Sequence, residues 1–206
     1  MVLILLILTS CACIVATEIL KRTFSLPTAL TRRVIHVTTA MVAVVAPLYV
    51  SQKEIIVVSI LFAAALIAGR RYNIFSAIHS VERDTFGEVF LPLGVALTAL
   101  FFLPHDISAF QFGICIMGIS DVVAGLIGEQ FGKHRATFFG NTKSLEGSLT
   151  FFLSTLLLTF LFVPVFGYDL LLTPLLLTLV EFCLVYGLDN LILPLAGAFL
   201  LQNIFH

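Results

Sequence analysis

The chain has 206 residues, of which 60% are hydrophobic and only 11% are charged, and its mean hydropathy is +1.12. This composition lies outside the range of soluble globular proteins and indicates a polytopic membrane protein. The formal net charge of -1 excludes broad nucleic-acid binding, which requires a basic surface that neutralises phosphates, so we expect no nucleic-acid partner.

Apolar runs divide the chain into a series of expected membrane spans. Because one span needs about 20 apolar residues, the length leaves room for roughly seven or eight spans and for no separate soluble domain. We therefore predict an all-α fold in which residues 1–206 form one integral membrane domain, a bundle of transmembrane helices. The first run has no preceding positive charge, so we expect a span there and not a secretory signal. The expected spans are Val2–Leu20, Val34–Val50, Ile55–Gly69, Phe86–Leu103, Ile107–Gly128, Leu145–Phe166, Leu170–Tyr186 and Leu191–Phe205.

The basic residues follow the alternation of these spans. Of the 11 Lys and Arg residues, all except Lys53 fall in the loops after the first, third and fifth spans. By the positive-inside rule these loops face the cytoplasm, and the N-terminus lies on the other side. In the loop after the third span, Tyr72–Asp84 mixes charges with apolar residues at helical spacing, which fits either a short interfacial helix or a connecting loop.

Several ionisable residues lie within the expected spans or at their ends. Such residues are costly in a membrane and are by default candidates for a functional site. With the orientation above, all of them fall in the cytoplasmic half of the bundle, which favours one site open to the cytoplasm. They are Glu18, His36, Asp121, Glu181 and Asp189.

The fifth span carries an acid in register with glycines. Asp121, Gly125, Gly128 and Gly132 recur at helical steps, which predicts one face of the helix. Without side chains there, phosphates or another backbone can approach closely. Helix packing through small residues is the alternative for the glycines alone. Packing does not require a carboxylate, so Asp121 on the same stripe favours a functional face.

The loop after this span supplies Lys133 and Arg135, and the next span opens with Lys143, Ser144 and, after one leucine, Glu146. Backbone N–H groups at a helix start, with a lysine and a serine beside them, are suited to phosphate. The spacing differs from that of a Walker loop. The positive-inside rule by itself also accounts for the basic residues of this loop.

Arg33 and His36 are three residues apart, on one side of the second span. The planar guanidinium suits phosphate, and the imidazole can donate, accept or carry a proton. The alternative is that Arg32 and Arg33 set topology and that the histidine bonds a neighbouring helix.

Four elements in order carry a resemblance to a known family. They are Arg32–His36 (Arg-Arg-Val-Ile-His), Ser120–Ala124 with Gly128 and Phe131–Lys133, Lys143–Ser148 (Lys-Ser-Leu-Glu-Gly-Ser), and Glu181 with Asp189–Leu191 and Pro194. These elements resemble the motifs of the CTP-dependent polyprenol kinases, which include dolichol and phytol kinases. Ser120 stands where that family usually has glycine before the aspartate, and Thr39-Ala40 replaces a glycine that often follows the histidine, but neither change removes a charged group.

The resemblance implies a membrane enzyme that transfers the γ-phosphoryl group of CTP to a long-chain isoprenoid alcohol such as dolichol, polyprenol or phytol. It implies Mg²⁺ or another divalent cation, bound by Asp121, Asp189 and Glu181, with one of the two aspartates as the base. Lys143 and His36 join the two aspartates as catalytic residues. The implied nucleotide- and phosphate-binding residues are Arg33, Lys133, Gly125, Gly128, Gly132, Ser144, Glu146, Gly147 and Asn190. The lipid alcohol arrives from the bilayer and the nucleotide from the cytoplasm.

Two other functions are weighed against a kinase. A cytidylyltransferase that forms a CDP-lipid also joins CTP to a lipid, but its paired D-R-x-D and H-G-G signatures are absent from the sequence. A proton-coupled transporter also carries acids in its spans, but transporters tend to have internal repeats and charges near the midplane, and neither is visible here. No residue pattern specifies an oligomeric state.

Overall fold

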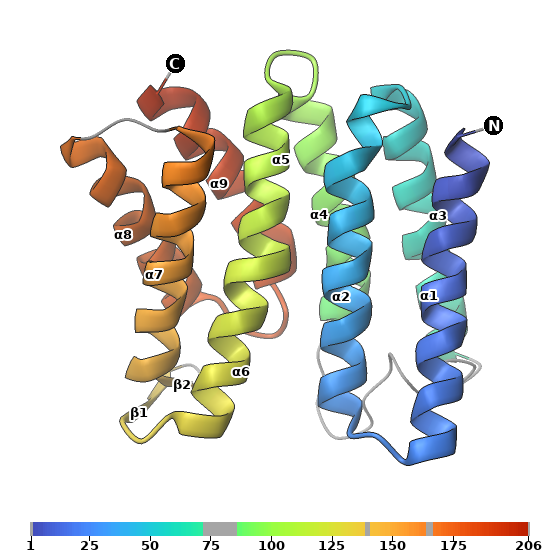
Figure 1. Ribbon diagram of the computed structural model, residues 1–206, viewed down its shortest axis with the longest axis horizontal. Coiled ribbons are helices and arrows are strands. Elements are labelled where there is room, and N and C mark those ends of the chain that lie inside the picture. Colours follow the sequence, from blue (N-terminus) through green and yellow to red (C-terminus); the bar gives the residue numbers. More distant parts are fainter. Residues whose placement is uncertain (1, 72–85, 139–140, 164–166, 206) are drawn as a thin grey trace.

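The computed structural model describes residues 2–71, 86–138, 141–163 and 167–205, and helices run up and down through the molecule in alternation (Figure 1). The predicted all-α helical bundle is confirmed. Its elements are α1 (Val2–Phe24), α2 (Thr28–Val45) with a 3-10 turn (Ala46–Leu48), α3 (Gln52–Arg71), α4 (Gly87–Phe102), α5 (Ile107–Cys115), a π-helical turn (Ile116–Ser120), α6 (Asp121–Phe131), β1 (Arg135–Phe138), β2 (Asn141–Ser144), α7 (Leu145–Phe162), α8 (Tyr168–Cys183) and α9 (Asp189–Phe205).

Five of the described helices are long and apolar enough to cross a membrane. They are α1, α2 with its 3-10 turn, α3, the continuous column of α5 and α6, and α7. The shorter helices α4 and α9 are also apolar. These helices are consistent with an integral membrane protein, and the total of seven or eight spans stays a prediction.

α2 and α9 are two of the helices that begin earlier than their hydropathy predicts. α2 begins at Thr28, directly after Pro27, and not at Val34. α9 begins at Asp189, which was expected to lie between two spans. In both cases polar residues form the first helical turn, where free backbone N–H groups tolerate polar surroundings. Hydropathy detects only the apolar part of such a helix.

The loop between α6 and α7 contains a β-hairpin that the sequence analysis did not predict. Its strands are antiparallel, with Arg135 opposite Ser144 and Ala136 opposite Lys143. Each strand has only four residues, so the hairpin adds to the helical bundle without changing its class. The hairpin lies at the same end as the α1–α2 connection, which we call the basic end because Lys21, Arg33 and Arg70 also lie there (Figure 1). The possible interfacial helix at Tyr72–Asp84 lies outside the described residues.

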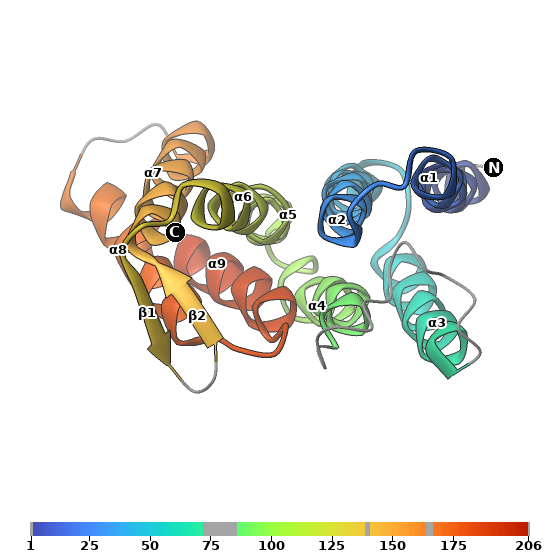
Figure 2. The same ribbon diagram turned by 90° about the horizontal axis from the view of Figure 1, so that it is seen from below.

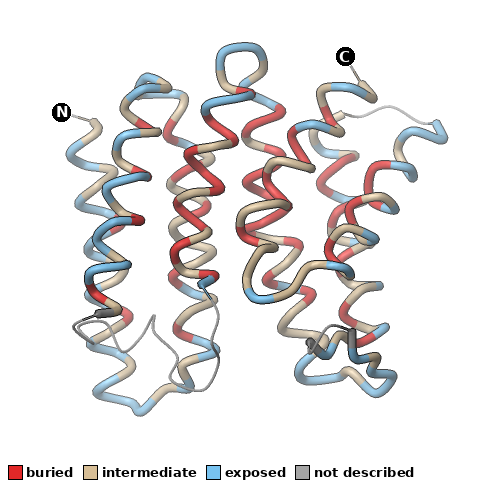
Figure 3. The backbone as a smooth tube through the Cα atoms, turned by 180° about the vertical axis from the view of Figure 1, so that it is seen from behind, coloured by how far each residue is buried: buried red, intermediate tan, exposed pale blue. Residues whose placement is uncertain are grey.

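The core is concentrated around α5 and α9, where burial is most continuous (Figure 3). These two helices approach so closely that a Cβ on Gly113 would overlap the carbonyl oxygen of Pro194 and lie 3.1 Å from the backbone nitrogen of Ala198. Phe112 adds an edge-to-face contact with Phe162 of α7, with ring centroids 5.4 Å apart. The tight side of the bundle therefore consists of α4, α5, α7 and α9.

The N-terminal helices are arranged as two pairs. α1 packs on α2, and α3 packs on α4. Seen along the helix axes, the two pairs stand apart from each other (Figure 2). Much of α1 is exposed, including Leu5, Leu8 and Ile19, as expected for a helix that faces lipid.

The contact of α5 with α9 yields the first prediction. Gly113→Ala places a methyl group against the Pro194 carbonyl, and such overpacking typically destabilises by about 1–3 kcal/mol. We expect a lower apparent melting temperature of the purified protein in detergent. Gly167→Ala is the matched control, because no atom of the described residues lies within 4 Å of a Cβ at that position. Equal melting temperatures for the two variants would contradict the close packing.

Candidate active site

One large cavity of about 1380 Å³ runs through the bundle. Its polar arm lies toward the basic end and is lined by residues of α2, α6, the hairpin, α7, α8 and α9, with Glu88 of α4. Its apolar arm lies among α1, α2, α3 and α4. The charged residues that line the polar arm are Arg32, Arg33, Glu88, Asp121, Glu129, Arg135, Lys143, Glu181 and Asp189, together with Lys21 of α1.

Asp121 is at the centre of this charge distribution. It interacts electrostatically with Asp189 and Glu181, and also with Lys143 and Arg33. These four partners come from four other elements, namely α9, α8, β2 and α2. Within the described part of the chain, the Asp121 carboxylate makes no hydrogen bond. The structure thus brings together the acids that the sequence placed in one half of the bundle, and leaves the Asp121 oxygens available to a ligand.

Lys143 and Glu181 form a buried ion pair. The Lys143 ammonium contacts Oε1 of Glu181 and also donates to the Glu181 main-chain carbonyl at 2.8 Å. Their side chains are only 16% and 7% exposed. The second carboxylate oxygen of Glu181, Oε2, is buried without a hydrogen-bond partner among the described residues. The pair therefore ties the hairpin to the end of α8 and leaves one acceptor unused.

Arg33 spans the gap between α2 and α6. Its guanidinium Nη2 lies 2.6 Å from Oε1 of Glu129. A Cβ on Gly125 would lie 3.3 Å from the same Nη2, so the glycine allows the arginine to lie along the surface of α6. Gly125 and Gly128 line the cavity together with Asp121, as the helical stripe predicted. The guanidinium is oriented by α6 at the rim of the polar arm.

His36 lies where the polar and apolar arms meet. It lines the cavity on the same side of α2 as Arg33, as their spacing predicted. The ring lies against the main chain of Met117, in the π-helical turn that precedes Asp121. Its Nε2 is buried and has no hydrogen-bond partner in the described residues.

Asn190 holds the start of α9 against the start of α4. Its side-chain amide donates to the carbonyl of Gly87 at 2.7 Å, and the residue is only 6% exposed. The preceding turn contains Gly187 with φ +86, a conformation that favours glycine, packed on the backbone of Gly87. Asn190 lines the cavity, and its amide nitrogen makes this contact between helices, so its expected role in nucleotide binding stays a prediction.

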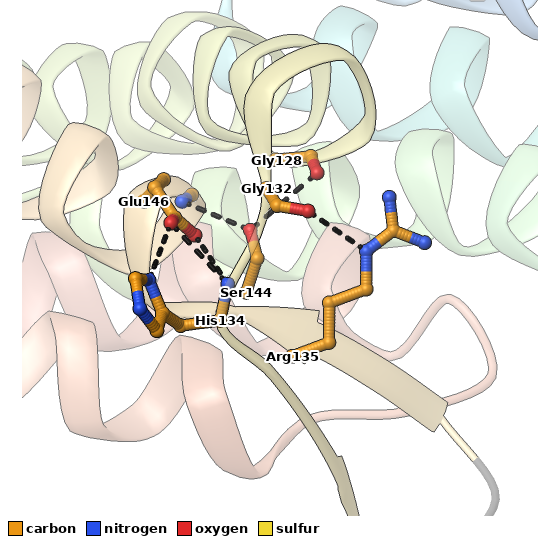
Figure 4. Close-up of polar contacts among 7 residues, drawn as sticks. Gly128, Gly132, His134, Arg135, Ser144 and Glu146 are labelled. Atoms are coloured by element: carbon orange, nitrogen blue, oxygen red, sulfur yellow. Dashed lines mark hydrogen bonds and ion pairs between the residues drawn. The ribbon is translucent and has the colours of Figure 1, made fainter.

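The start of α7 is capped by its own residues. Ser144 Oγ accepts a hydrogen bond from the backbone N–H of Gly147 at 3.1 Å (Figure 4). Glu146 accepts from the backbone and from the ring Nδ1 of His134, the latter at 2.8 Å. Ser144 and Gly147 still line the cavity, whereas Glu146 does not. The expected phosphate cradle at this helix start is therefore partly used for capping.

Gly132 and Lys133 lie outside the cavity. α6 ends at Phe131, so Gly132 follows the helix and does not extend the stripe of Asp121 along its face. A Cβ on Gly132 would overlap the carbonyl of Gly128 and come within 2.6 Å of the Ser144 Cβ, which is the close packing considered as the alternative for these glycines. Lys133 lines a separate shallow hollow with Glu146. The direct phosphate contact expected of Lys133 finds no support in this placement.

Glu18, Arg32 and Arg135 also differ from expectation, the first by lying outside the cavity and the other two by lining it. Glu18 pairs with Arg22 on its own helix at 2.8 Å and does not line the cavity. Arg32 and Arg135 do line it, although neither was among the residues expected at the site. The side chain of Arg135 points away from Glu146 and His134 (Figure 4). Its Nε donates a hydrogen bond to the carbonyl of Gly132 at 3.0 Å. The orientation of Arg135 and Lys143 could have been predicted only if the sequence had indicated the hairpin that carries them.

The described residues contain no group of three or more His, Cys, Asp or Glu side chains that could by itself hold a metal ion. Asp121, Asp189 and Glu181 are nevertheless close enough to interact. Mg²⁺ is commonly held by one or two carboxylates plus phosphate oxygens and water, so a preassembled cage is not required. The unused Asp121 oxygens and Glu181 Oε2 fit such a cation, and Lys143 and Arg33 only partly offset the three acids.

The Lys143–Glu181 pair gives a stability prediction. Removing one partner of a buried ion pair leaves an uncompensated charge and typically destabilises by about 3–5 kcal/mol. We expect Lys143→Met to lower the melting temperature in detergent clearly, and Lys143→Met combined with Glu181→Leu to regain part of the loss. Lys53→Met, at an exposed lysine on the opposite end, is the control. A double variant as unstable as the single one would show that the charge pair is not the cause.

Comparison with known proteins finds two informative relatives. The chain is 29% identical to a phytol kinase from Synechocystis sp. over 196 residues, which cover 91% of this chain and 84% of that protein. It is 31% identical over 124 residues to an uncharacterized protein of Methanocaldococcus jannaschii, with 59% of this chain and 61% of that protein covered. No family model matches the chain, and no solved structure matches it. Similarity over most of the length supports a phytol kinase-like relationship, in agreement with the four sequence elements.

Proposed function

We propose that the chain is a membrane lipid kinase that transfers the γ-phosphoryl group of CTP to a long-chain isoprenoid alcohol such as phytol, polyprenol or dolichol. The observation that carries this proposal is the cavity, whose polar arm gathers carboxylates and basic side chains and whose other arm is apolar. Similarity to a phytol kinase supports the transfer to a lipid alcohol. The choice of CTP rests on the resemblance of the four sequence elements.

Phosphoryl transfer asks mainly for positioning and charge stabilisation, which this polar arm can supply. Arg33 and Lys143 are the first candidates for contacts with the phosphates. Arg32 and Arg135 extend the basic lining toward the basic end, from which a nucleotide would arrive. Arginine suits this task because its planar fork can bind two phosphate oxygens at once. We assign the basic end to the cytoplasm on the positive-inside rule.

The acids have two tasks in this proposal. Asp121 and Asp189, with Glu181 in support, hold a divalent cation, which neutralises charge on the phosphates when bound. One of the two aspartates accepts the proton of the alcohol hydroxyl as its oxygen attacks the γ-phosphorus. The bond from the γ-phosphorus to the bridging oxygen breaks, and CDP leaves with that electron pair. His36, at the junction of the two arms, orients the hydroxyl.

The position of a radioactive phosphorus label in CTP distinguishes this reaction from the formation of a CDP-lipid. Purified protein with Mg²⁺ and a lipid alcohol should transfer label from γ-labelled CTP to the lipid, and should transfer none from α-labelled CTP. The reverse pattern, seen with a phosphatidate-like acceptor, would identify a cytidylyltransferase. A panel of alcohols crossed with the four nucleoside triphosphates then defines both substrates.

Asp121 is the residue on which the mechanism depends most. Asp121→Asn keeps the shape but removes the charge, and we expect kcat to fall at least about a hundredfold, as for loss of a central electrostatic group. Asp169→Asn is the matched control, because Asp169 lies exposed at the opposite end of the bundle and does not line the cavity. Retention of full activity by Asp121→Asn would remove this carboxylate from the mechanism.

A further inference from the structure

The apolar arm of the cavity is built by one face of each N-terminal helix. α1 contributes Ile7 and Ile14, α3 contributes Val58 and Phe62, and α4 contributes Leu91. Residues lining the arm recur at helical spacing, so each helix presents one continuous stripe. The one hydroxyl of α1 in this wall, that of Ser10, donates to the carbonyl of Leu6 in its own helix. The lining of the apolar arm therefore presents mainly hydrocarbon and few polar groups to a ligand.

Apolar residues line the end of the arm that is far from the charged residues. Leu6, Ala46, Val50 and Ile55 line the cavity there and also belong to one apolar cluster. Along α2, the distance from His36 to Ala46 covers ten residues, which is roughly 15 Å at the rise of an α-helix. The lined stretch of the arm along α2 therefore extends about 15 Å from the polar site.

Residues of both α1 and α3 line the arm. Each of these helices packs on its own partner, and the two pairs stand apart in the view along the helix axes (Figure 2). A small apolar cluster of Ile14, Ile35 and Leu66 joins α1, α2 and α3. Residues on the outer faces, such as Val57 and Leu61, are exposed apolar side chains as at a lipid boundary.

We propose that this arm binds the single hydrocarbon tail of the lipid alcohol, that the tail arrives from the bilayer between α1 and α3, and that Val58 and Phe62 limit its length and width. The proposal deepens the proposed function and rests on it for the identity of the headgroup. Continuity with the polar arm supports this occupant, because an amphiphile that fills the apolar arm places its hydroxyl beside His36 and Asp121. In this proposal, the part of a longer tail that exceeds the arm stays in the bilayer.

A pair of neighbouring valines gives a matched test of the site. Val58 lines the arm, whereas Val57 on the same helix is 56% exposed and does not line it. Val58→Phe should fill the arm, and Val57→Phe should add the same bulk to the lipid-facing surface. The direct probe is a long-chain primary alcohol with a photoactivatable diazirine near the end of its tail, added to the purified full chain in lipid nanodiscs.

Photolabelling reads out binding without requiring turnover. We expect label on residues 3–14 and 55–66, reduced by an excess of unlabelled long-chain alcohol. Val58→Phe should lose at least about nine-tenths of this competable label, consistent with the cost of overfilling a packed site, and Val57→Phe should keep it. Label that is not competed, or that is equal in the two variants, would overturn the proposed tail site.

Activity measurements separate this inference from the kinase proposal. If both hold, Val58→Phe should lower kcat/KM for long-chain alcohols about tenfold or more while sparing short alcohols, and Val57→Phe should change neither. An equal loss with short and long alcohols would contradict a tail site. Competable labelling without phosphoryl transfer from any nucleotide would refute the kinase and support the tail site.

Discussion

The buried pair of Lys143 and Glu181 is the contact on which the polar arm depends. A carboxylate and an ammonium within an apolar bundle are tolerated only when they satisfy each other, because desolvating either charge alone is expensive. Here the lysine comes from a hairpin strand and the acid from the end of α8, so their contact fixes the position of the hairpin over the bundle. Arg33 does the same between α2 and α6 through Glu129. The charges therefore form part of the framework as well as of the proposed chemistry.

The two sides of the bundle differ in how tightly they are packed. On one side, glycines let α5 and α9 approach until a methyl group at Gly113 has no room. On the other side, α1 packs mainly along α2, and α3 along α4, with a small apolar cluster joining the two pairs and apolar faces left toward lipid. A phosphoryl-transfer site needs fixed charges, whereas a flexible hydrocarbon tail needs space of the right polarity. The division of the cavity into a polar and an apolar arm follows this difference.

Much of the helical framework could be predicted from the sequence, because each span is a long apolar run and the basic loops alternate. This alternation also placed His36, Asp121, Glu181 and Asp189 at one level, and all four line the cavity. The alternation of basic loops does not show how each helix is rotated about its axis, and therefore which of its side chains face the cavity. Glu18 lies in the same half of the bundle as these residues, but its side chain pairs with Arg22 and does not line the cavity. Arg32 and Arg33 are adjacent in the sequence, yet both line the cavity. The hairpin could not be predicted from the sequence, because polar strands of four residues show little hydrophobic periodicity.

The π-helical turn between Cys115 and Asp121 sets the direction in which the acid faces. The backbone N–H of Asp121 donates to Ile116, five residues back, where an α-helix would bond Met117. An extra residue in a helical turn rotates everything that follows by about 100°, since an α-helix has 3.6 residues per turn. Without it, the column from Ile107 to Phe131 would keep its tight packing face throughout, and Asp121, Gly125 and Gly128 would point elsewhere. One inserted residue thus lets a single helical column serve as core in one half and as a wall of the cavity's polar arm in the other.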